Sequence, residues 1–307
     1  MSNSLRLTTG RALVCALALT LVACPKKGPG GGPQPFNSQH GVPADVLAVA
    51  RIDAPTLLSR AGLKDASALV EKLTEKLRKE IGVDLALLRD ATLFYAPGTG
   101  ESLPRRGAAI IPQVLKDSPG LGKLGAAQEV EGRPAYKLGA TATVSFVEGG
   151  TVVGDVLSVQ QSLQSFAGKR PALAKDDALW RALDAVGNQP FRLSLKLAGL
   201  GKFLSRLPVP GLDKVQYAGI GGDVTATDLV LDIVLMTQDA PNLAATLKKA
   251  VSELAAQLSS SMIFKIFADL LSGIQITAGV DRVSVNAKLP IGLMETLLPI
   301  VMGTMDM

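Results

Sequence analysis

The chain has 307 residues, of which 47% are hydrophobic and 19% are charged, and this balance excludes intrinsic disorder as its general state. Aromatic residues make up only 4%, so a folded core must be built mainly from Leu, Val, Ile and Ala. The formal charge of +5 comes without a cluster of Lys and Arg, and this argues against nucleic acid as a partner.

Residues 1–23 are predicted to be a secretory signal peptide. Arg6 and Arg11 supply its positive end, and an apolar run over 12–23 follows them. A membrane-spanning helix needs about 20 apolar residues, and this run is clearly shorter. We therefore expect the leader to be removed during export.

The end of the leader, Leu21-Val22-Ala23-Cys24, resembles the lipobox of bacterial lipoproteins. The resemblance implies that the lipoprotein signal peptidase reads Leu21, Val22 and Ala23 and cleaves before Cys24. It also implies a diacylglyceryl group on the Cys24 thiol and a fatty acid such as palmitate on the new amino group. Several acyl chains on one cysteine hold a protein at a membrane almost irreversibly. An ordinary signal peptide, with a cysteine at this position by chance, is the alternative.

Pro25 and Lys26 follow the cysteine, with no Asp beside it. Under the sorting rule of enteric lipoproteins, this resemblance implies anchoring in the outer membrane, with the body facing the periplasm.

Residues 24–43 are predicted to be the lipidated cysteine and a tether. The segment 25–43 (PKKGPGGGPQPFNSQHGVP) is dominated by Pro and Gly and holds almost no core-forming residue. We expect a spacer that keeps the body near the bilayer, with Lys26 and Lys27 at the lipid headgroups. His40 is the only histidine of the chain and lies in this spacer, where we assign no role to it.

Residues 44–175 are predicted to form a first α+β unit, because period-2 alternation marks strands and a period near 3.6 marks helices. The expected elements are a strand over 45–53, a helix over 66–81, strands over 91–96 and 107–113, a hairpin of 142–147 and 151–156, and a helix over 159–167. Gly82 ends the first helix as a C-cap residue does.

Residues 176–307 are predicted to form a second α+β unit. The expected elements are a helix over 176–185, a strand over 191–197, a helix over 200–207, a strand pair of 216–224 and 229–236, a helix over 242–258, a hairpin of 274–280 and 283–289, and a helix over 292–301. Their order repeats that of the first unit. We therefore expect an α+β fold made of a tandem pseudo-repeat, each unit having antiparallel strands with amphipathic helices packed on a face.

The body also resembles a family of uncharacterised bacterial envelope proteins, classed as a domain of unknown function. The likeness rests on Pro43-Ala44-Asp45 through Ile52-Asp53, on Gly82-Val83-Asp84, and on Asp176 to Ala185. These motifs are loose and structural. They imply an envelope protein but no catalytic or binding residue.

The residue types exclude most well-marked chemistries. Cys15 lies in the leader and Cys24 at its end, so the mature body has no disulfide, and with one histidine it has no triad or His-based metal site. Gly219-Ile220-Gly221-Gly222 lies within a predicted strand, so we interpret it as a bulge or a tight strand contact rather than a nucleotide loop. We predict no cofactor and no metal.

Carboxylates remain the only acid–base candidates. Asp176 and Asp177 precede a helix, where Asp ordinarily caps the first turn. Asp223, Asp228 and Asp232 surround one turn between strands, and their convergence would indicate a hydrolase or a hard-metal site. We favour turn and exposed-face positions for them.

One apolar stripe is a candidate binding surface: Ile263, Ile266, Phe267, Leu270 and Leu271 recur at helical spacing. Such a stripe would suit a groove for acyl chains or contact with a bilayer. Such a stripe is also typical of an amphipathic helix that covers a sheet, and we prefer this interpretation.

We therefore expect a non-enzymatic, membrane-anchored envelope lipoprotein that binds a partner protein or supports envelope structure. A periplasmic carrier or sensor of lipids and other apolar ligands is the alternative, and a carboxylate-based hydrolase is the third hypothesis.

Overall fold

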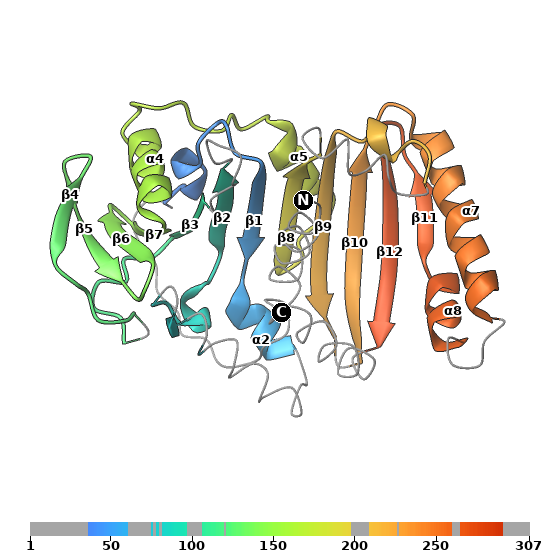
Figure 1. Ribbon diagram of the computed structural model, residues 1–307, viewed down its shortest axis with the longest axis horizontal. Helices are drawn as coiled ribbons and strands as arrows, with labels where there is room; N and C mark the ends of the chain where they lie inside the picture. Colours follow the sequence, from blue (N-terminus) through green and yellow to red (C-terminus); the bar gives the residue numbers. More distant parts are fainter. Residues whose placement is uncertain are drawn as a thin grey trace, which may run out of the picture. The chain divides into compact units, whose positions relative to one another are not determined.

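The computed structural model describes residues 36–60, 75, 78–79, 82–96, 106–119, 121–197, 209–225, 227–259 and 265–290. The chain divides between Asp177 and Ala178, close to the boundary expected between residues 175 and 176. Unit 1 holds the described residues up to Asp177, and unit 2 holds those from Ala178 onward (Figure 1). The α+β class is confirmed, because each unit combines helices with antiparallel strands.

Unit 1 contains a seven-stranded antiparallel run in the order β1-β2-β3-β7-β6-β5-β4. Its strands are β1 (Ala48–Ile52), β2 (Ala91–Ala96), β3 (Arg106–Ile111), β4 (Ala127–Val130), β5 (Arg133–Leu138), β6 (Ala142–Val147) and β7 (Gly150–Gly154). Its helical elements are η1 (Ser38–Gly41), α2 (Ala54–Arg60), η2 (Leu85–Leu87) and α4 (Val156–Phe166).

Helix α4 covers one face of this sheet, against β3, β6 and β7. Asp155 starts the helix, because its side chain accepts hydrogen bonds from the Leu157 and Ser158 backbone nitrogens. The helix therefore begins three positions before the expected Val159. Val159 and Leu163 face the sheet and are buried. Ile110 and Val152, opposite each other on β3 and β7, are fully buried under this helix.

The hairpin of β4 and β5 was not expected from the sequence. Its turn is Glu131-Gly132, and both residues have positive φ, 53° and 75°. Two such residues make the type I′ turn that suits a two-residue hairpin loop. Six of the ten side chains of β4 and β5 are exposed, four of them polar, so no regular apolar alternation marked these strands.

The tether ends earlier than the sequence suggested. Ser38–Gly41 form the 3₁₀ helix η1, and Val42, with 0% of its surface exposed, is part of the core of unit 1. Pro43 forms a β-bridge with Ala172. The expectation that the spacer extends to Pro43 is therefore wrong, because a segment poor in large apolar residues still docks when its few apolar side chains fit an existing core.

His40, which was expected in a spacer, lies in η1 with its ring 3.2 Å from the Asn37 side-chain amide. Three expected helices, over 66–81, 200–207 and 292–301, lie wholly or mostly outside the described residues.

Unit 2 contains a five-stranded antiparallel run in the order β11-β12-β10-β9-β8. Its strands are β8 (Phe191–Lys196), β9 (Tyr217–Val224), β10 (Asp228–Met236), β11 (Gln275–Ala278) and β12 (Arg282–Pro290). Its helical elements are α5 (Ala178–Ala185), η4 (Leu212–Lys214), α7 (Ala240–Ser259) and α8 (Lys265–Ser272). The strands expected over 191–197, 216–224, 229–236 and 283–289 are thus present within a residue or two of their expected bounds.

Candidate functional site

The two faces of the unit 2 sheet differ in chemistry. Along β10, Leu231, Ile233 and Leu235 alternate with Asp232 and Val234, so the two sets lie on opposite faces. Helix α7 packs on the apolar face, where its Leu243 belongs to the same buried cluster as Val283 and Ile276. Figure 1 shows α7 and α8 beside β11 and β12.

The opposite face carries α5, which packs on β8, β9 and β10. Gly219 allows this close approach, because a Cβ atom at that position would lie well inside contact distance of the Ala182 carbonyl oxygen in α5. Gly219 and Gly221 are both buried members of β9. The interpretation of the stretch from Gly219 to Gly222 as a tight strand contact is therefore confirmed.

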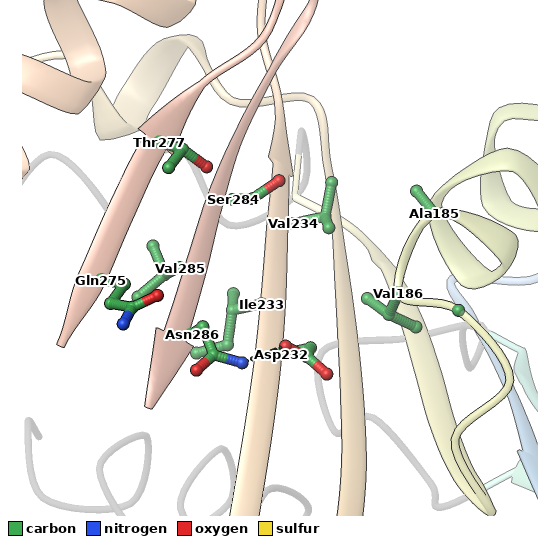
Figure 2. Close-up of a pocket in the computed structure, with 11 residues that line it drawn as sticks. Ala185, Val186, Asp232, Ile233, Val234, Gln275, Thr277, Ser284, Val285 and Asn286 are labelled. Atoms are coloured by element: carbon green, nitrogen blue, oxygen red, sulfur yellow. Dashed lines mark hydrogen bonds between the residues drawn. The ribbon is translucent and has the colours of Figure 1, made fainter. Parts of the chain in front are cut away.

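A groove of about 320 Å³ opens where α5 ends, over the part of this face that α5 leaves uncovered. Its wall is the C-terminal end of α5, at Ala185, Val186 and Gly187. Its floor comes from three neighbouring strands, β10, β12 and β11, and its polar side chains are Asp232, Gln275, Thr277, Ser284 and Asn286 (Figure 2). The strand register places these five on one face, because Asp232 lies opposite Asn286, which lies opposite Gln275.

Asp232 is fixed by two amides. Its Oδ1 accepts a hydrogen bond of 2.6 Å from Asn286 Nδ2, and its Oδ2 accepts one of 2.7 Å from Gln189 Nε2. Figure 2 shows the Asn286 amide directed at the Asp232 carboxylate. Asn286 lies on the neighbouring strand β12, and Gln189 lies in the link between α5 and β8. The hydrogen-bonded Asp232 and Asn286 therefore form a rigid polar part of the groove floor. The hydroxyls of Ser284 and Thr277, which can rotate, lie beside them.

This arrangement can bind polar groups but offers little for proton transfer. Each oxygen of the Asp232 carboxylate already accepts a hydrogen bond, and among the described residues that line the groove Asp232 alone is titratable. General acid–base pairs need a second titratable group within reach of the same substrate atom. Within the described part of the chain, no three His, Cys, Asp or Glu side chains gather as a metal site would require.

Of the three acids that the sequence grouped around one turn, Asp223 and Asp228 do not line the groove. Asp223 Oδ1 accepts a hydrogen bond from the Val224 backbone nitrogen, and Asp228 Oδ2 accepts one from the Thr227 hydroxyl. Of these three acids, Asp232 is the one that lines the groove. Asp176 and Asp177 lie immediately before α5.

The structure describes only part of the apolar stripe. Ile263 lies outside the described residues, and Ile266 belongs to α8 but its side chain is not described. Phe267, Leu270 and Leu271 are half-buried on α8, which packs on α7 and β12. These three side chains are neither fully in the core nor free in solvent.

The predicted lipidation and signal-peptidase residues, Leu21, Val22, Ala23 and Cys24, lie outside the described residues. Among the helices that the structure describes, none combines the length and the hydropathy that crossing a bilayer requires.

The groove was not predicted from the sequence, although the sequence does contain the alternating polar residues that form part of its floor. Gln275 and Thr277 alternate with Ile276, and Ser284 and Asn286 alternate with Val285. Polar residues at every second position of a hairpin indicate one solvent-facing side. The sequence does not show which strands become neighbours, and so it does not show that Asp232 meets Asn286.

Comparisons with known proteins add little. No family model matches the sequence, and no curated protein matches it. Among solved structures, the chain is similar to crystal form I of TP0453, with a TM-score of 0.47 and 10% identity over 88% of this chain and 98% of that chain. Crystal form IV of TP0453 gives a TM-score of 0.43 and 11% identity over 87% and 97%. We draw no functional conclusion from likenesses of this size.

Proposed function

We propose that this chain is a lipid-anchored lipoprotein of the bacterial cell envelope, and that its body binds a partner without catalysing a reaction. The lipobox-like end of the leader, Leu21-Val22-Ala23-Cys24, supports the anchor. Pro25 and Lys26 after the cysteine support an outer-membrane location with the body in the periplasm.

The observation that carries the binding role is the groove of unit 2. Its floor holds amide, hydroxyl and carboxylate groups on three adjacent strands, and Asp232 is locked between Asn286 and Gln189. Preorganised hydrogen-bonding groups in a concave surface favour recognition of a polar partner, because they lose little freedom on binding. The expected partner is a polar segment of an envelope protein.

The strand orders support an origin by duplication, which we include in the proposal. Unit 1 runs β1-β2-β3-β7-β6, and unit 2 runs β8-β9-β10-β12-β11. In both units, the first three strands pair in chain order. A later hairpin then joins the sheet through its second strand, which pairs with the third strand of the unit: β7 with β3, and β12 with β10. The units differ between their third strand and that hairpin, where unit 1 has β4 and β5 and unit 2 has α7 and α8.

The anchor is tested by changing Cys24→Ser, with Cys15→Ser in the leader as the matched control. The Cys24→Ser protein should lose membrane attachment and remain uncleaved by the lipoprotein signal peptidase, while Cys15→Ser should behave like the wild type. Fractionation after a high-salt wash measures this. A Cys24→Ser protein that still sediments with membranes would show that the lipobox interpretation is wrong.

The groove is tested by photo-crosslinking in cells, with the crosslinking side chain placed at Thr277 in the groove or at Ser252 on the exposed side of α7. We expect a product specific to Thr277. Adding Asn286→Leu, which removes the hydrogen bond that Asn286 donates to Asp232, should diminish that product. The same products from Thr277 and Ser252, or none from Thr277, would argue against a binding role for the groove.

A lipid carrier or sensor is the second candidate, and one observation favours it. Phe267, Leu270 and Leu271 remain half-buried on α8, and Leu254 of the neighbouring helix α7 is 46% exposed. Exposed apolar side chains on adjoining helices are one feature of apolar-ligand and membrane contacts.

A further inference from the structure

The N-terminal segment is tied to one end of unit 1. The Phe36 ring lies 5.4 Å from the Phe166 ring at the C-terminal end of α4, measured between ring centres. It also covers the turn between β6 and β7, where a Cβ atom on Gly150 would come within 2.5 Å of the Phe36 ring. Gly150 is therefore the residue that leaves room for Phe36.

The residues after Phe36 are held along unit 1 by hydrogen bonds. The Ser38 hydroxyl lies 2.8 Å from the Thr92 hydroxyl of β2. The Leu173 backbone nitrogen donates to the Val42 carbonyl at 2.7 Å.

The next residues hold the same segment to the chain that follows α4. The Ala44 backbone nitrogen donates to the Pro171 carbonyl at 3.1 Å, and Arg170 forms a 2.7 Å ion pair with Asp45. The segment from Phe36 to Asp45 is thus a strap fixed at several points. Its first residue, Phe36, is held against Phe166 at the end of α4.

The two ends of unit 1 can be told apart from the register. The turn at Glu148 and Gly149 follows the end of β6, beside Phe36 and the C-terminus of α4. Ala140 lies in the turn before β6, at the other end of the same strand. Six strand residues at about 3.3 Å each separate the two turns by about 20 Å.

Chain length limits how far the strap can lie from a lipidated Cys24. Twelve residues lead from Cys24 to Phe36, so the two are at most about 43 Å apart even if every residue is extended. The Pro/Gly composition predicts a typical distance of about 20 Å. The chain from the anchor therefore joins unit 1 at the end that holds Phe36.

We propose that the end of unit 1 formed by Phe36, the Glu148-Gly149 turn and the C-terminus of α4 faces the lipid bilayer. This inference rests on the lipid anchor of the proposed function. The partner of this surface is the headgroup layer of the membrane in which Cys24 is held. The strap, rather than the tether alone, sets the orientation, because it fixes the point at which the chain leaves the body.

Energy transfer to the bilayer tests the orientation in the full lipidated protein. Because the mature body has no cysteine of its own, Glu148→Cys or Ala140→Cys provides a single labelling site for a donor dye, and both positions are exposed. The labelled proteins are placed in vesicles of phosphatidylethanolamine and phosphatidylglycerol that carry an acceptor dye on their headgroups. We expect clearly higher transfer from position 148 than from position 140.

Equal transfer from the two positions, or higher transfer from position 140, would overturn the proposed orientation. Lengthening the tether by twelve Gly/Ser residues before Phe36 should lower the transfer from position 148, and no change there would also overturn it. Flotation of the labelled protein with the vesicles, compared with Cys24→Ser, reports on the anchor separately. A protein that floats but shows no difference between the two dyes refutes the orientation and leaves the anchor standing.

Discussion

At the scale of single residues, the Glu131 carboxylate of unit 1 accepts three side-chain hydrogen bonds. Its Oε1 accepts hydrogen bonds from Gln160 Nε2 at 2.9 Å and from Gln164 Nε2 at 2.8 Å, and its Oε2 accepts one from Lys169 Nζ at 3.2 Å. The hydrogen bonds from Gln160 and Gln164, and then that from Lys169, lower the pKa of the Glu131 carboxyl. Because Glu131 is in the β4–β5 turn, these contacts tie that hairpin to α4 and the residues after it.

The lowered pKa of Glu131 predicts a pH-dependent contribution to stability. A carboxyl whose pKa is lower in the folded than in the unfolded protein stabilises the fold above its unfolded pKa, and this stabilisation is lost as the pH falls through the folded pKa. Glu131→Gln should therefore lower the unfolding midpoint at pH 7, and the difference from the wild type should shrink toward pH 3. Urea unfolding at both pH values measures this. Glu129→Gln, on the exposed side of β4, is the control and should change little at either pH.

Gly219 gives a second prediction at this scale. The methyl group of Gly219→Ala would meet the backbone of α5 at the Ala182 carbonyl, which cannot move without shifting the helix. Overpacking of this kind costs about 1–3 kcal/mol of unfolding free energy. Thermal or urea unfolding measures the loss. Gly273→Ala, where the nearest atom lies at an ordinary contact distance of 3.4 Å, should be nearly neutral, and an equal loss in both variants would contradict the packing argument.

At the scale of elements, the sequence predicted those strands whose side chains alternate between apolar and polar or are apolar throughout. Strand β2 matches its expected bounds, and the β9–β10 pair nearly so, because Ala, Val, Leu and Phe occupy several of their buried positions. Strand β4 was missed because three of its four side chains are exposed, so its place in the sheet depends on the turn and on the backbone ladder with β5.

Helix α8 decides between the two functional candidates. Phe267 is half-buried on this helix, which packs on α7 and β12. If the stripe covers the sheet, Phe267→Asp places a charge in a partly apolar contact and should cost about 1–3 kcal/mol of unfolding free energy. Urea unfolding of the purified protein in mild detergent measures this, and Phe267→Leu should retain most of the stability.

The lipid-carrier hypothesis predicts a different outcome for the same variant. Phe267→Asp would then leave the unfolding curve unchanged and reduce the binding of fatty acids or liposomes. That result would place the carrier or sensor ahead of the partner-binding module.

At the scale of the whole molecule, the docked strap predicts where proteases cut. The strap from Phe36 to Asp45 contains buried residues and several backbone hydrogen bonds, so it should resist cleavage. Limited proteolysis should therefore yield a stable fragment that begins before or at Phe36, as read by mass spectrometry. A stable fragment that begins after Val42 would show that the strap is not held in solution.

The sequence by itself determined the properties that depend on local patterns. The proposed leader and lipobox rest on a contiguous string of residue types, and the α+β class follows from hydrophobic periodicity within single segments. The close strand contact at Gly219 could be anticipated for the same reason, since glycine within a strand pattern indicates a near neighbour.

Only the tertiary structure decided what depends on contacts between distant segments. Asp232 and its two amide partners, Gln189 and Asn286, are 43 and 54 residues apart in the chain, and the strand order brings them together. The strap at Phe36 likewise exists because Gly150, far along the chain, leaves a space that a phenyl ring fills. Periodicity reports which side of its own element a residue takes, whereas packing and strand register decide which other element it meets.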